Sequence, residues 1–289
     1  MKHKNIFLLL FLVLIPVFAF SQWQEARLMT NMAGVAVKGN NFANDSNCFA
    51  VWRFEFGGVT TDSKGSPPNT LTNVNAVYSY VNKYKEGVSS GYFDDALSQC
   101  LYISDAGLSS GFPLKNGDST KKITMCAWVR ASSHQTLSDE GHYIFTKGAQ
   151  NKMSFLVDFH KEVTSGHVHL MLEIGYNGGA STEKKYHGTE VAIDTWYHVT
   201  VSYDEAGGTH NYALRLRDEN GAVVGSDIES TATLDGSGIN IEDASVYIGA
   251  LYYTSAIRFW DGLIDEAVVF NKILTATEVT LIAKGRYGR

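Results

Sequence analysis

The sequence predicts an all-β protein built as an antiparallel sandwich of two sheets, and three observations support this prediction. Aromatic residues make up 12% of the 289 residues, with 27 Gly and only 4 Pro, and aromatic and β-branched side chains fit the pleated surface of a sheet. Short apolar runs recur along the chain between clusters of Gly, Asn and Asp, a spacing typical of sandwiches. Hydrophobic residues reach 44%, enough to fill a sizeable core.

The first residues predict export. The charged stretch "MKHKN" precedes a fifteen-residue apolar run, "IFLLLFLVLIPVFAF", and then "SQ". A membrane-spanning helix needs about 20 apolar residues, so the run indicates a signal peptide over 1–21 that is cleaved near Ser21 or Gln22. An uncleaved anchor is the alternative. Residues 22–47 are polar and aperiodic and predict a lead-in segment. The expected location of the mature protein is extracellular or periplasmic, with no membrane span.

The strand pattern begins at residue 48 and predicts one domain over 48–289. Most runs are bounded by Gly, Asn or Asp, which favour turns. Asn220–Gly221 lies between two such runs and predicts a hairpin turn. In order, the expected strands are "CFAVWRFEF", "CLYISD", "ITMCAWVRA", "HYIFTKG", "MSFLVDFH", "HVHLMLEIGY", "TWYHVTVSYD", "NYALRLRD", "AVVGSD", "SVYIGALYY" and "GLIDEAVVF".

The tail carries the pattern of a short helix over 275–284. In "TATEVTLIAKG", Thr275 can cap the backbone amide three residues on, and Glu278 can reach back, which forms a capping box. Gly285 provides a stop. The sequence therefore predicts that the last strand runs into a capped C-terminal helix.

Charge and cysteine content restrict the classes of partner and of bound metal. The net charge is −6 and no basic run follows the first residues, which argues against a nucleic acid or an anionic membrane as the partner. The three cysteines are Cys48, Cys100 and Cys126, and an odd count leaves at least one thiol outside any internal disulfide. One disulfide or three buried thiols both fit. The spacing matches no zinc motif.

Six stretches, in order, resemble a laminin-G-like, concanavalin-A-like jelly-roll domain of secreted bacterial proteins. The resemblance covers roughly residues 48–285 and implies the two-sheet jelly roll. The chain departs from the family pattern where Glu55 is followed by Phe56, because an Asp-Gly pair is usual there. The stretches are "VWRFEFGGVTTDSKG", "SGYFDDALSQCLYIS", "ITMCAWVRA", "YIFTKG", "TWYHVTVSYD" and "GLIDEAVVFNKILTATEV".

The resemblance also implies a calcium site where the first and last strands lie close together. Its acids would be Glu55, Asp62 and Asp265, because calcium prefers carboxylate and carbonyl oxygens. Alternation along a strand places Asp265 and Glu266 on opposite sides, so Asp265 is expected to belong to the site and Glu266 is not. The alternative is that Asp265 caps a backbone amide and that Glu266 lies on a solvated face.

The sequence offers little support for catalysis. Glucanases of this sandwich class carry the spacing E-x-D-x-x-E on one strand, and the chain lacks it. Polysaccharide lyases on related sandwiches use a His or Tyr base, and His167 and His169 share a predicted strand face. We therefore expect a non-enzyme, with a polysaccharide-active enzyme, lyase before hydrolase, as the alternative.

Sugar recognition is the leading hypothesis, because two inter-strand loops concentrate aromatic and polar side chains. The predicted function is a secreted recognition module that binds a glycan or an extracellular protein. A structural or adhesion protein that makes only protein contacts is a further alternative. For Trp260, packing on the sheet is the competing explanation. The candidate ligand-binding residues are Tyr176, Tyr186, Tyr252, Tyr253, Arg258 and Trp260.

Overall fold

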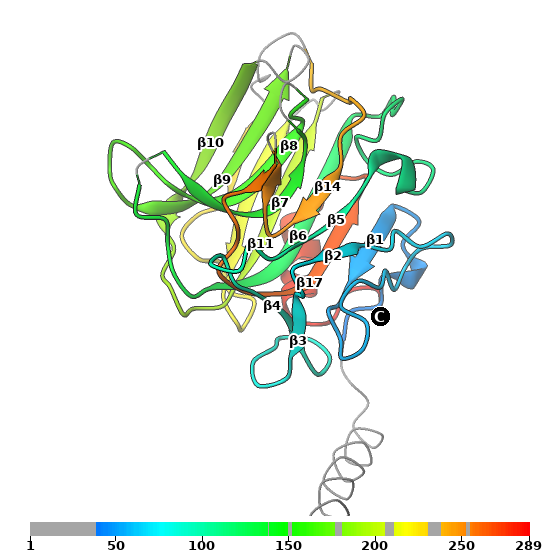
Figure 1. Ribbon diagram of the computed structural model, residues 1–289, viewed down its shortest axis with the longest axis horizontal. Coiled ribbons are helices and arrows are strands. Elements are labelled where there is room, and N and C mark those ends of the chain that lie inside the picture. The colour runs from blue at the N-terminus through cyan, green and yellow to red at the C-terminus, as the bar shows by residue number, and fades with distance from the viewer. Residues whose placement is uncertain are drawn as a thin grey trace, which may run out of the picture. The chain divides into compact units, whose positions relative to one another are not determined.

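Two antiparallel sheets stack face to face in a computed structural model of the chain (Figure 1). The structure describes residues 39–137, 139–149, 152–176, 181–205, 211–230, 238–252 and 255–289. The predicted all-β sandwich is confirmed. The predicted signal peptide lies outside the described residues and stays a prediction. Within the described ranges, no helix is long and apolar enough to cross a membrane.

Sheet A has eight strands among the described residues, in the order β13-β12-β11-β6-β17-β4-β3, with β1 paired to β17. Strand β17 is central because it pairs with β1, β4 and β6. The strands are β1 Cys48–Trp52, β3 Tyr78–Tyr80, β4 Ser90–Phe93, β6 Lys122–Ala131, β11 Tyr197–Asp204, β12 Tyr212–Arg217, β13 Ile228–Ser230 and β17 Gly262–Phe270.

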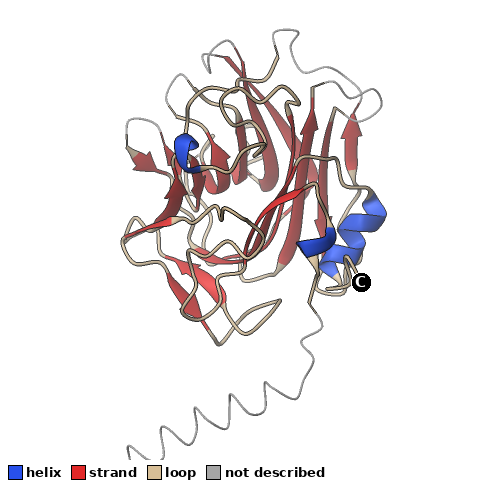
Figure 2. Cartoon of the chain, turned by 90° about the vertical axis from the view of Figure 1, so that its right-hand side faces the viewer, coloured by secondary structure: helices blue, strands red, loops and turns tan. Residues whose placement is uncertain are grey.

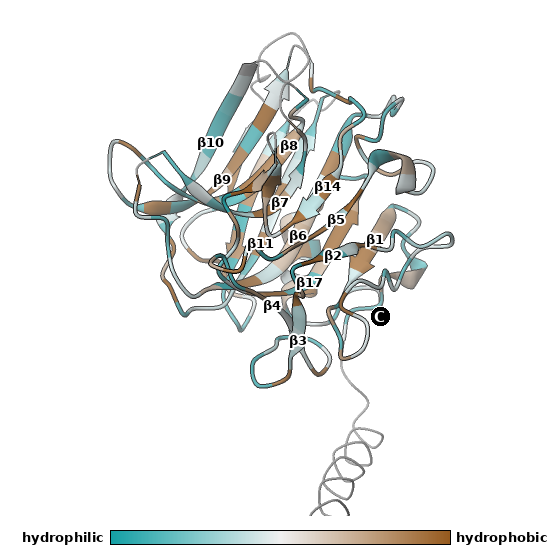
Figure 3. Cartoon of the chain, viewed as in Figure 1, coloured by the Kyte–Doolittle hydropathy of each residue, from teal (hydrophilic) through white to brown (hydrophobic). Residues whose placement is uncertain are grey.

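Sheet B has seven strands in the described part of the chain, in the order β10-β9-β8-β7-β14-β5-β2. Its edge strand β10 is mostly hydrophilic (Figure 3), as expected of an edge that must avoid pairing with other chains. A two-stranded hairpin, β15 Leu251–Tyr252 with β16 Ala256–Ile257, follows β14. The strands of sheet B are β2 Thr72–Val74, β5 Cys100–Ile103, β7 Gly141–Lys147, β8 Phe155–Lys161, β9 Val168–Tyr176, β10 Ser181–Glu190 and β14 Val246–Ile248.

The main core lies between the two sheets and takes alternate side chains from both. Strand β8 shows the pattern: Phe155, Val157 and Phe159 belong to the core, so Asp158 and His160 point to the opposite face of the sheet. The same alternation gives each sheet an outer face, turned away from the core. These outer faces hold the candidate sites.

Helix α2 (Ala276–Ala283) confirms the predicted C-terminal helix. Thr275 accepts the amide of Glu278 and Glu278 reaches back to Thr275, which completes the capping box. Val279 and Ile282 pack with Val268 and Phe270 on the outer face of sheet A. Figure 2 shows the helix beside the strands of that sheet. Two short 3-10 turns, η1 Phe42–Asn44 and η2 Asp105–Gly107, are the other helical elements among the described residues.

The first and last strands pair, as predicted, with Val51 opposite Val268. Strand β1 ends at Trp52 and does not reach residue 56, because the backbone turns at Phe54, whose φ is +56°. A left-handed φ cannot continue a strand. Residues 39–47, the end of the predicted lead-in, pack on the sandwich, since the ring of Phe42 lies 5.9 Å from that of Phe270.

The expected turn at Asn220–Gly221 is present, but the run after it does not form the expected strand, because Val223 makes only an isolated bridge to Arg217 and β13 begins at Ile228. The cysteines agree with one of the two expectations. The amide of Gly221 bonds to the carbonyl of Asp218, and Gly221 has a φ of +72°. All three cysteines are buried and free. Of the two alternatives for the cysteines, the structure therefore has the buried thiols.

Candidate functional site

A row of three tyrosines crosses the outer face of sheet B. Tyr102 of β5 lies opposite Tyr247 of β14, with ring centroids 5.4 Å apart and planes at 19°. Tyr247 also stacks on Tyr252 of β15, at 5.4 Å and 12°. Tyr247 is 8% exposed, whereas Tyr102 and Tyr252 are partly exposed. This tyrosine row therefore offers aromatic surface at its two ends.

Strand alternation and the β15–β16 hairpin place the tyrosine row. Val246 and Ile248 enter the core, so Tyr247 between them must face outward. Leu251 of the hairpin packs on Tyr143 and on Leu156, both on sheet B. The hairpin is thereby held against the outer face, and this packing positions its tyrosine beside the row.

Arg258 follows the hairpin and lies next to the buried phenol of Tyr143. The two side chains share a hydrogen bond, and burial raises the pKa of Tyr143 well above its usual value. The guanidinium is also 3.7 Å from Glu140 and is one-third exposed. Arg258 is therefore a fixed, partly accessible cation on this face.

A buried acid–imidazole pair lies on the same face, on strand β8. His160 Nδ1 is 2.9 Å from Asp158, and Nε2 is 3.1 Å from the exposed carboxylate of Asp139. Asp158 and His160 are both 0% exposed. Gly141 provides the room, because a Cβ there would lie 1.7 Å from a carboxylate oxygen of Asp158. A side chain at position 141 would therefore displace the pair.

Both members of the pair have a higher pKa in the folded protein than in water. Burial raises the pKa of Asp158 to about 6, despite the neighbouring imidazole. Burial alone would lower the pKa of His160, but the hydrogen bonds and charges of Asp158 and Asp139 outweigh it, and the pKa is raised. Asp158 Oδ1 is buried and has no hydrogen-bond partner among the described residues. Because both imidazole nitrogens face carboxylates, these contacts favour the protonated form of His160.

Strand β10 forms the far rim of this face. The ring of Tyr186 lies 5.8 Å from that of His160. Lys184 Nζ is 2.6 Å from Asp139. Both side chains are partly exposed. The outer face of sheet B thus combines tyrosine rings with partly exposed side chains of both signs of charge.

The structure brings together three of the six predicted ligand-binding residues, since Tyr186, Tyr252 and Arg258 share this face. Trp260 and Tyr176 do not join them. Trp260 is 0% exposed and packs on Phe159 in the core, with centroids 5.4 Å apart. For Trp260 the packing explanation is therefore the correct one.

Tyr176 is also a correction, because it is 1% exposed within the core and has its hydroxyl 3.2 Å from Glu183. A loop position was expected for it, but strand β9 continues through Tyr176 and turns its ring inward. Tyr253, the remaining candidate, lies outside the described residues.

The three predicted metal ligands do not form one site. Asp62 accepts four hydrogen bonds, from the amides of Val51, Lys64 and Asn69 and from the Asn69 side chain. These donors occupy both of its carboxylate oxygens. Asp62 therefore holds the first loop to β1 and has no free lone pair for a cation.

Asp265 caps backbone amides, which was the alternative to metal binding in the sequence analysis. One of its oxygens accepts from the amides of Lys85 and Glu86, at 2.7 and 3.0 Å. The other is buried without a hydrogen-bond partner in the described part of the chain. Burial raises the pKa of Asp265 well above its usual value, and the nearby charges of Glu266 and Glu55 add to this. Glu55 itself accepts the amide of Val88 at 3.1 Å.

Glu266 is not the solvated residue that was considered, because it is 2% exposed and ion-paired with Arg53. A β-bulge between Asp265 and Val268 interrupts the register, and Glu266 has a φ of +47°. The bulge inserts one extra residue, so simple alternation fails at this point. Burial raises the pKa of Glu266 to about 7.

The junction of β1 and β17 offers few carboxylate ligands for calcium. Within the described ranges, no group of three or more His, Cys, Asp or Glu side chains is arranged to hold a metal ion. The charge of Glu55 contributes to the raised pKa of Asp265, whereas the carboxylate of Asp62 is fully engaged elsewhere. The three-carboxylate set does not fit, and a cation would need backbone carbonyls beside these two acids.

The sequence analysis did not single out several residues of the sheet B face: Tyr102, Asp139, Tyr143, Asp158, His160, Lys184 and Tyr247. A signal was present in "SFLVDFH", where Asp and His alternate with apolar residues. Polar groups at alternate positions of an otherwise apolar strand mark one polar face. The tyrosines lacked such a signal, because they come from strands that are far apart in the sequence.

The comparisons agree with this architecture. Residues 105–280 match the family model of the concanavalin A-like lectin/glucanases superfamily. The chain belongs to this superfamily. No curated protein matches the sequence closely enough to add a relative. The superfamily name covers both lectins and glucanases, so membership does not choose between binding and catalysis.

Solved structures share the fold at low sequence identity. Domain 4 of AbnA, a GH43 extracellular arabinanase from Geobacillus stearothermophilus, was solved with arabinotriose; it is 15% identical over 82% of this chain and 98% of that chain, with a TM-score of 0.54. The binding domain of botulinum neurotoxin serotype G is 14% identical over 82% of this chain and 50% of that chain, at 0.53. The enzymatically active domain of tailspike protein 2 from bacteriophage CBA120 is 13% identical over 75% and 30%, at 0.50. This sandwich therefore occurs in both binding and enzymatic domains.

Proposed function

We propose that the protein is a secreted, non-catalytic recognition module that binds a glycan through the outer face of sheet B. The tyrosine row carries this proposal, because the C–H faces of sugar rings stack on aromatic side chains while polar groups nearby fix the hydroxyls. Arg258, Lys184 and Asp139 are the accessible polar groups on this face. The sugar complex of the arabinanase domain supports a sugar as the ligand.

A glycan panel with matched variants tests the proposal. Affinity electrophoresis in neutral and acidic polysaccharides, arabinan included, should retard the wild-type protein in at least one gel. Tyr252→Ala should lower the affinity at least tenfold, because it removes an accessible end of the tyrosine row. Tyr84→Ala should have no effect, since Tyr84 is 44% exposed and lies outside the row. Equal retardation of both variants would move the site away from this face.

The same panel separates the alternatives. New ultraviolet absorbance from unsaturated sugar ends would identify a lyase and overturn the non-catalytic proposal. Self-association without retardation in any gel would favour a structural or adhesion protein. An extracellular protein partner would then have to replace the glycan as the ligand.

Calcium is proposed as a stabilising ion at the junction of β1 and β17, near Glu55 and Asp265. Support comes from the unpartnered buried oxygen of Asp265 and from the nearby charges of Glu266 and Glu55, which raise the pKa of Asp265 and which a cation would offset. A ligand that binds only the native state raises its stability by mass action. A chelator should then lower the melting temperature of calcium-loaded protein, and Asp265→Ala should abolish the difference. Glu266→Ala should preserve it. An unchanged melting temperature would end the calcium proposal.

Export is proposed on the apolar run at the N-terminus. Intact mass measurement of protein recovered from the culture medium or periplasm should show cleavage near Ser21–Gln22. A secreted chain that still begins at Met1 would contradict the signal-peptide prediction.

A further inference from the structure

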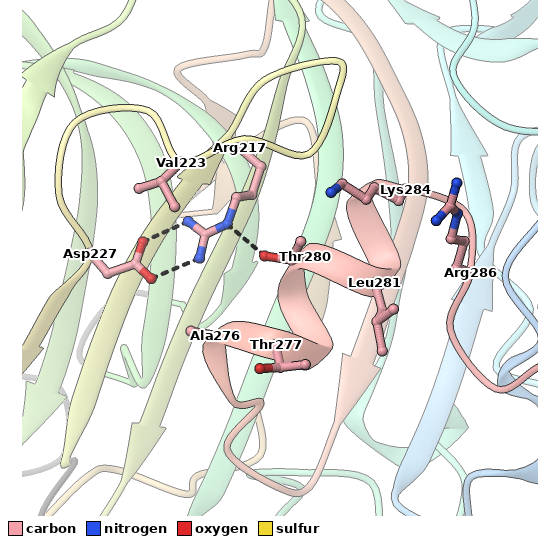
Figure 4. A pocket seen from close by; sticks show the side chains of 9 residues that line it. All are labelled: Arg217, Val223, Asp227, Ala276, Thr277, Thr280, Leu281, Lys284 and Arg286. Carbon is pink, nitrogen blue, oxygen red and sulfur yellow. Dashed lines mark hydrogen bonds and ion pairs between the residues drawn. The ribbon is translucent and has the colours of Figure 1, made fainter.

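A hollow lies between helix α2, which packs on the outer face of sheet A, and the segment that follows β12 (Figure 4). This α2 groove has a volume of about 380 Å³. Its walls come from the helix and from residues 217–227. It shares no residue with the tyrosine row, so the glycan proposal does not explain it.

Arg217 forms the floor of the α2 groove as a fixed ion pair. It is 1% exposed, and its two terminal nitrogens lie 2.6 and 2.7 Å from the two oxygens of Asp227. Its Nε is 3.3 Å from the hydroxyl of Thr280 on α2. Figure 4 shows these three side chains in line across the groove. The floor is thus rigid and close to neutral, because the bidentate carboxylate balances the guanidinium.

Two further cations make the groove positive. Lys284 and Arg286 line it and are exposed, and neither forms an ion pair with any described residue. The stem of Lys284 lies on the turn at Gly221, where a Cβ would come within 2.6 Å of its Cγ. Three cations against one carboxylate leave the groove at about +2, in a chain whose net charge is −6. Charge complementarity therefore favours an acidic occupant.

The walls of the groove are aliphatic. Leu281 and Val223 are 37% and 53% exposed and both line the hollow. No aromatic ring is among its lining residues in the described part of the chain, so a sugar ring would have no surface on which to stack. An aliphatic side chain would bury apolar area against these walls.

We propose that the α2 groove binds an acidic peptide segment of a partner protein, with a carboxylate at Lys284 and Arg286 and an aliphatic side chain against Leu281 and Val223. The module would then have two independent sites. A glycan would bind to the outer face of sheet B, and an acidic segment would bind beside α2, which covers the outer face of sheet A.

Nuclear magnetic resonance titration of ¹⁵N-labelled protein tests this proposal. The probe is Ac-Glu-Leu-Glu-NH₂, and Ac-Gln-Leu-Gln-NH₂ is its uncharged match. The acidic peptide should shift amide signals of β12, the turn after it and α2, and it should bind about tenfold more tightly than the amide peptide. Raising the salt from about 50 mM to about 300 mM should weaken it, because exposed charges are screened.

Paired variants locate the site. Lys284→Ala with Arg286→Ala should lower the affinity for the acidic peptide about tenfold, whereas Lys83→Ala with Lys161→Ala, which removes two cations outside the groove, should leave it unchanged. Tyr252→Ala should also leave it unchanged, which separates this site from the glycan site. Thermal melting of each variant checks that the fold is intact.

Three results would overturn the proposal. Equal affinities for the acidic and the amide peptide would show that the carboxylates of the peptide do not contribute to binding. Equal loss in the two double variants would show only non-specific attraction. Tighter binding of tetragalacturonate than of the acidic peptide, with the same amides shifted, would identify the groove as a site for acidic glycans.

Discussion

The outer faces of the two sheets are covered in different ways. On sheet A, helix α2 seals an apolar patch that contains Val268 and Phe270. On sheet B, the short β15–β16 hairpin covers only part of a face that carries tyrosines, an arginine and the Asp158–His160 pair. The packing of α2 stabilises the fold, whereas the proposed glycan site lies on the more open face of sheet B. We therefore expect substitutions under α2 to affect mainly stability, and substitutions on the open face to affect mainly glycan binding.

The largest expected effect on stability comes from a residue buried under α2. Phe270→Ala should lower the free energy of unfolding by about 3–5 kcal/mol, because it removes a fully buried ring and leaves a cavity. Urea unfolding of the wild-type and variant proteins measures this difference. A loss below about 1 kcal/mol would mean that α2 does not seal this face.

The buried acid of sheet B should give the next largest effect, and it depends on pH. Burial raises the pKa of Asp158 in the folded protein to about 6, from an ordinary value of 3.8. A raised folded pKa contributes stability that is complete below the unfolded value and is lost as pH rises through the folded one. Between pH 4 and pH 7, wild type should lose about 2 kcal/mol relative to Asp158→Asn.

The pH experiment also includes His160, whose raised pKa acts in the same direction. Its contribution is complete below pH 6.5 and declines as pH rises through the raised value. Urea unfolding at intervals from pH 4 to pH 8 records both. Parallel curves for the wild type and Asp158→Asn would show that the pair does not hold extra protons.

A smaller effect is expected at the start of α2. Thr275→Ala removes the cap that accepts the amide of Glu278 at 3.2 Å and should cost about 1 kcal/mol. Thr275→Ser keeps a capping hydroxyl and should restore most of the loss. The cap stabilises only the helical cover of sheet A, so glycan affinity should stay at the wild-type value in both variants.

The smallest stability effect should come from the open face. Tyr102→Ala should lower the free energy of unfolding by about 1 kcal/mol or less, because its ring is partly exposed. Glycan affinity should nevertheless fall at least tenfold. A large loss of stability without a loss of affinity would reverse the division between the two faces.

The sequence by itself determined the sandwich and the capped helix, whereas the pairing of the first and last strands was implied by the family resemblance. The sandwich and the helix depend on local alternation, on turn residues and on caps, all of which can be seen within a few neighbouring residues. Two local signals are present in the structure as expected: the capping box of Thr275 and Glu278, and the turn at Asn220–Gly221.

Only the tertiary structure decided which predicted side chains reach the surface. Tyr252 and Trp260 belong to one short stretch, yet one joins the tyrosine row and the other is fully buried. The bulge in β17 buried Glu266, and a carboxylate expected to bind metal, Asp62, became a fourfold acceptor for backbone and side-chain donors. The burial of a side chain and its hydrogen-bond partners depend on which strands pair across the fold. Local alternation along one strand does not reveal that pairing.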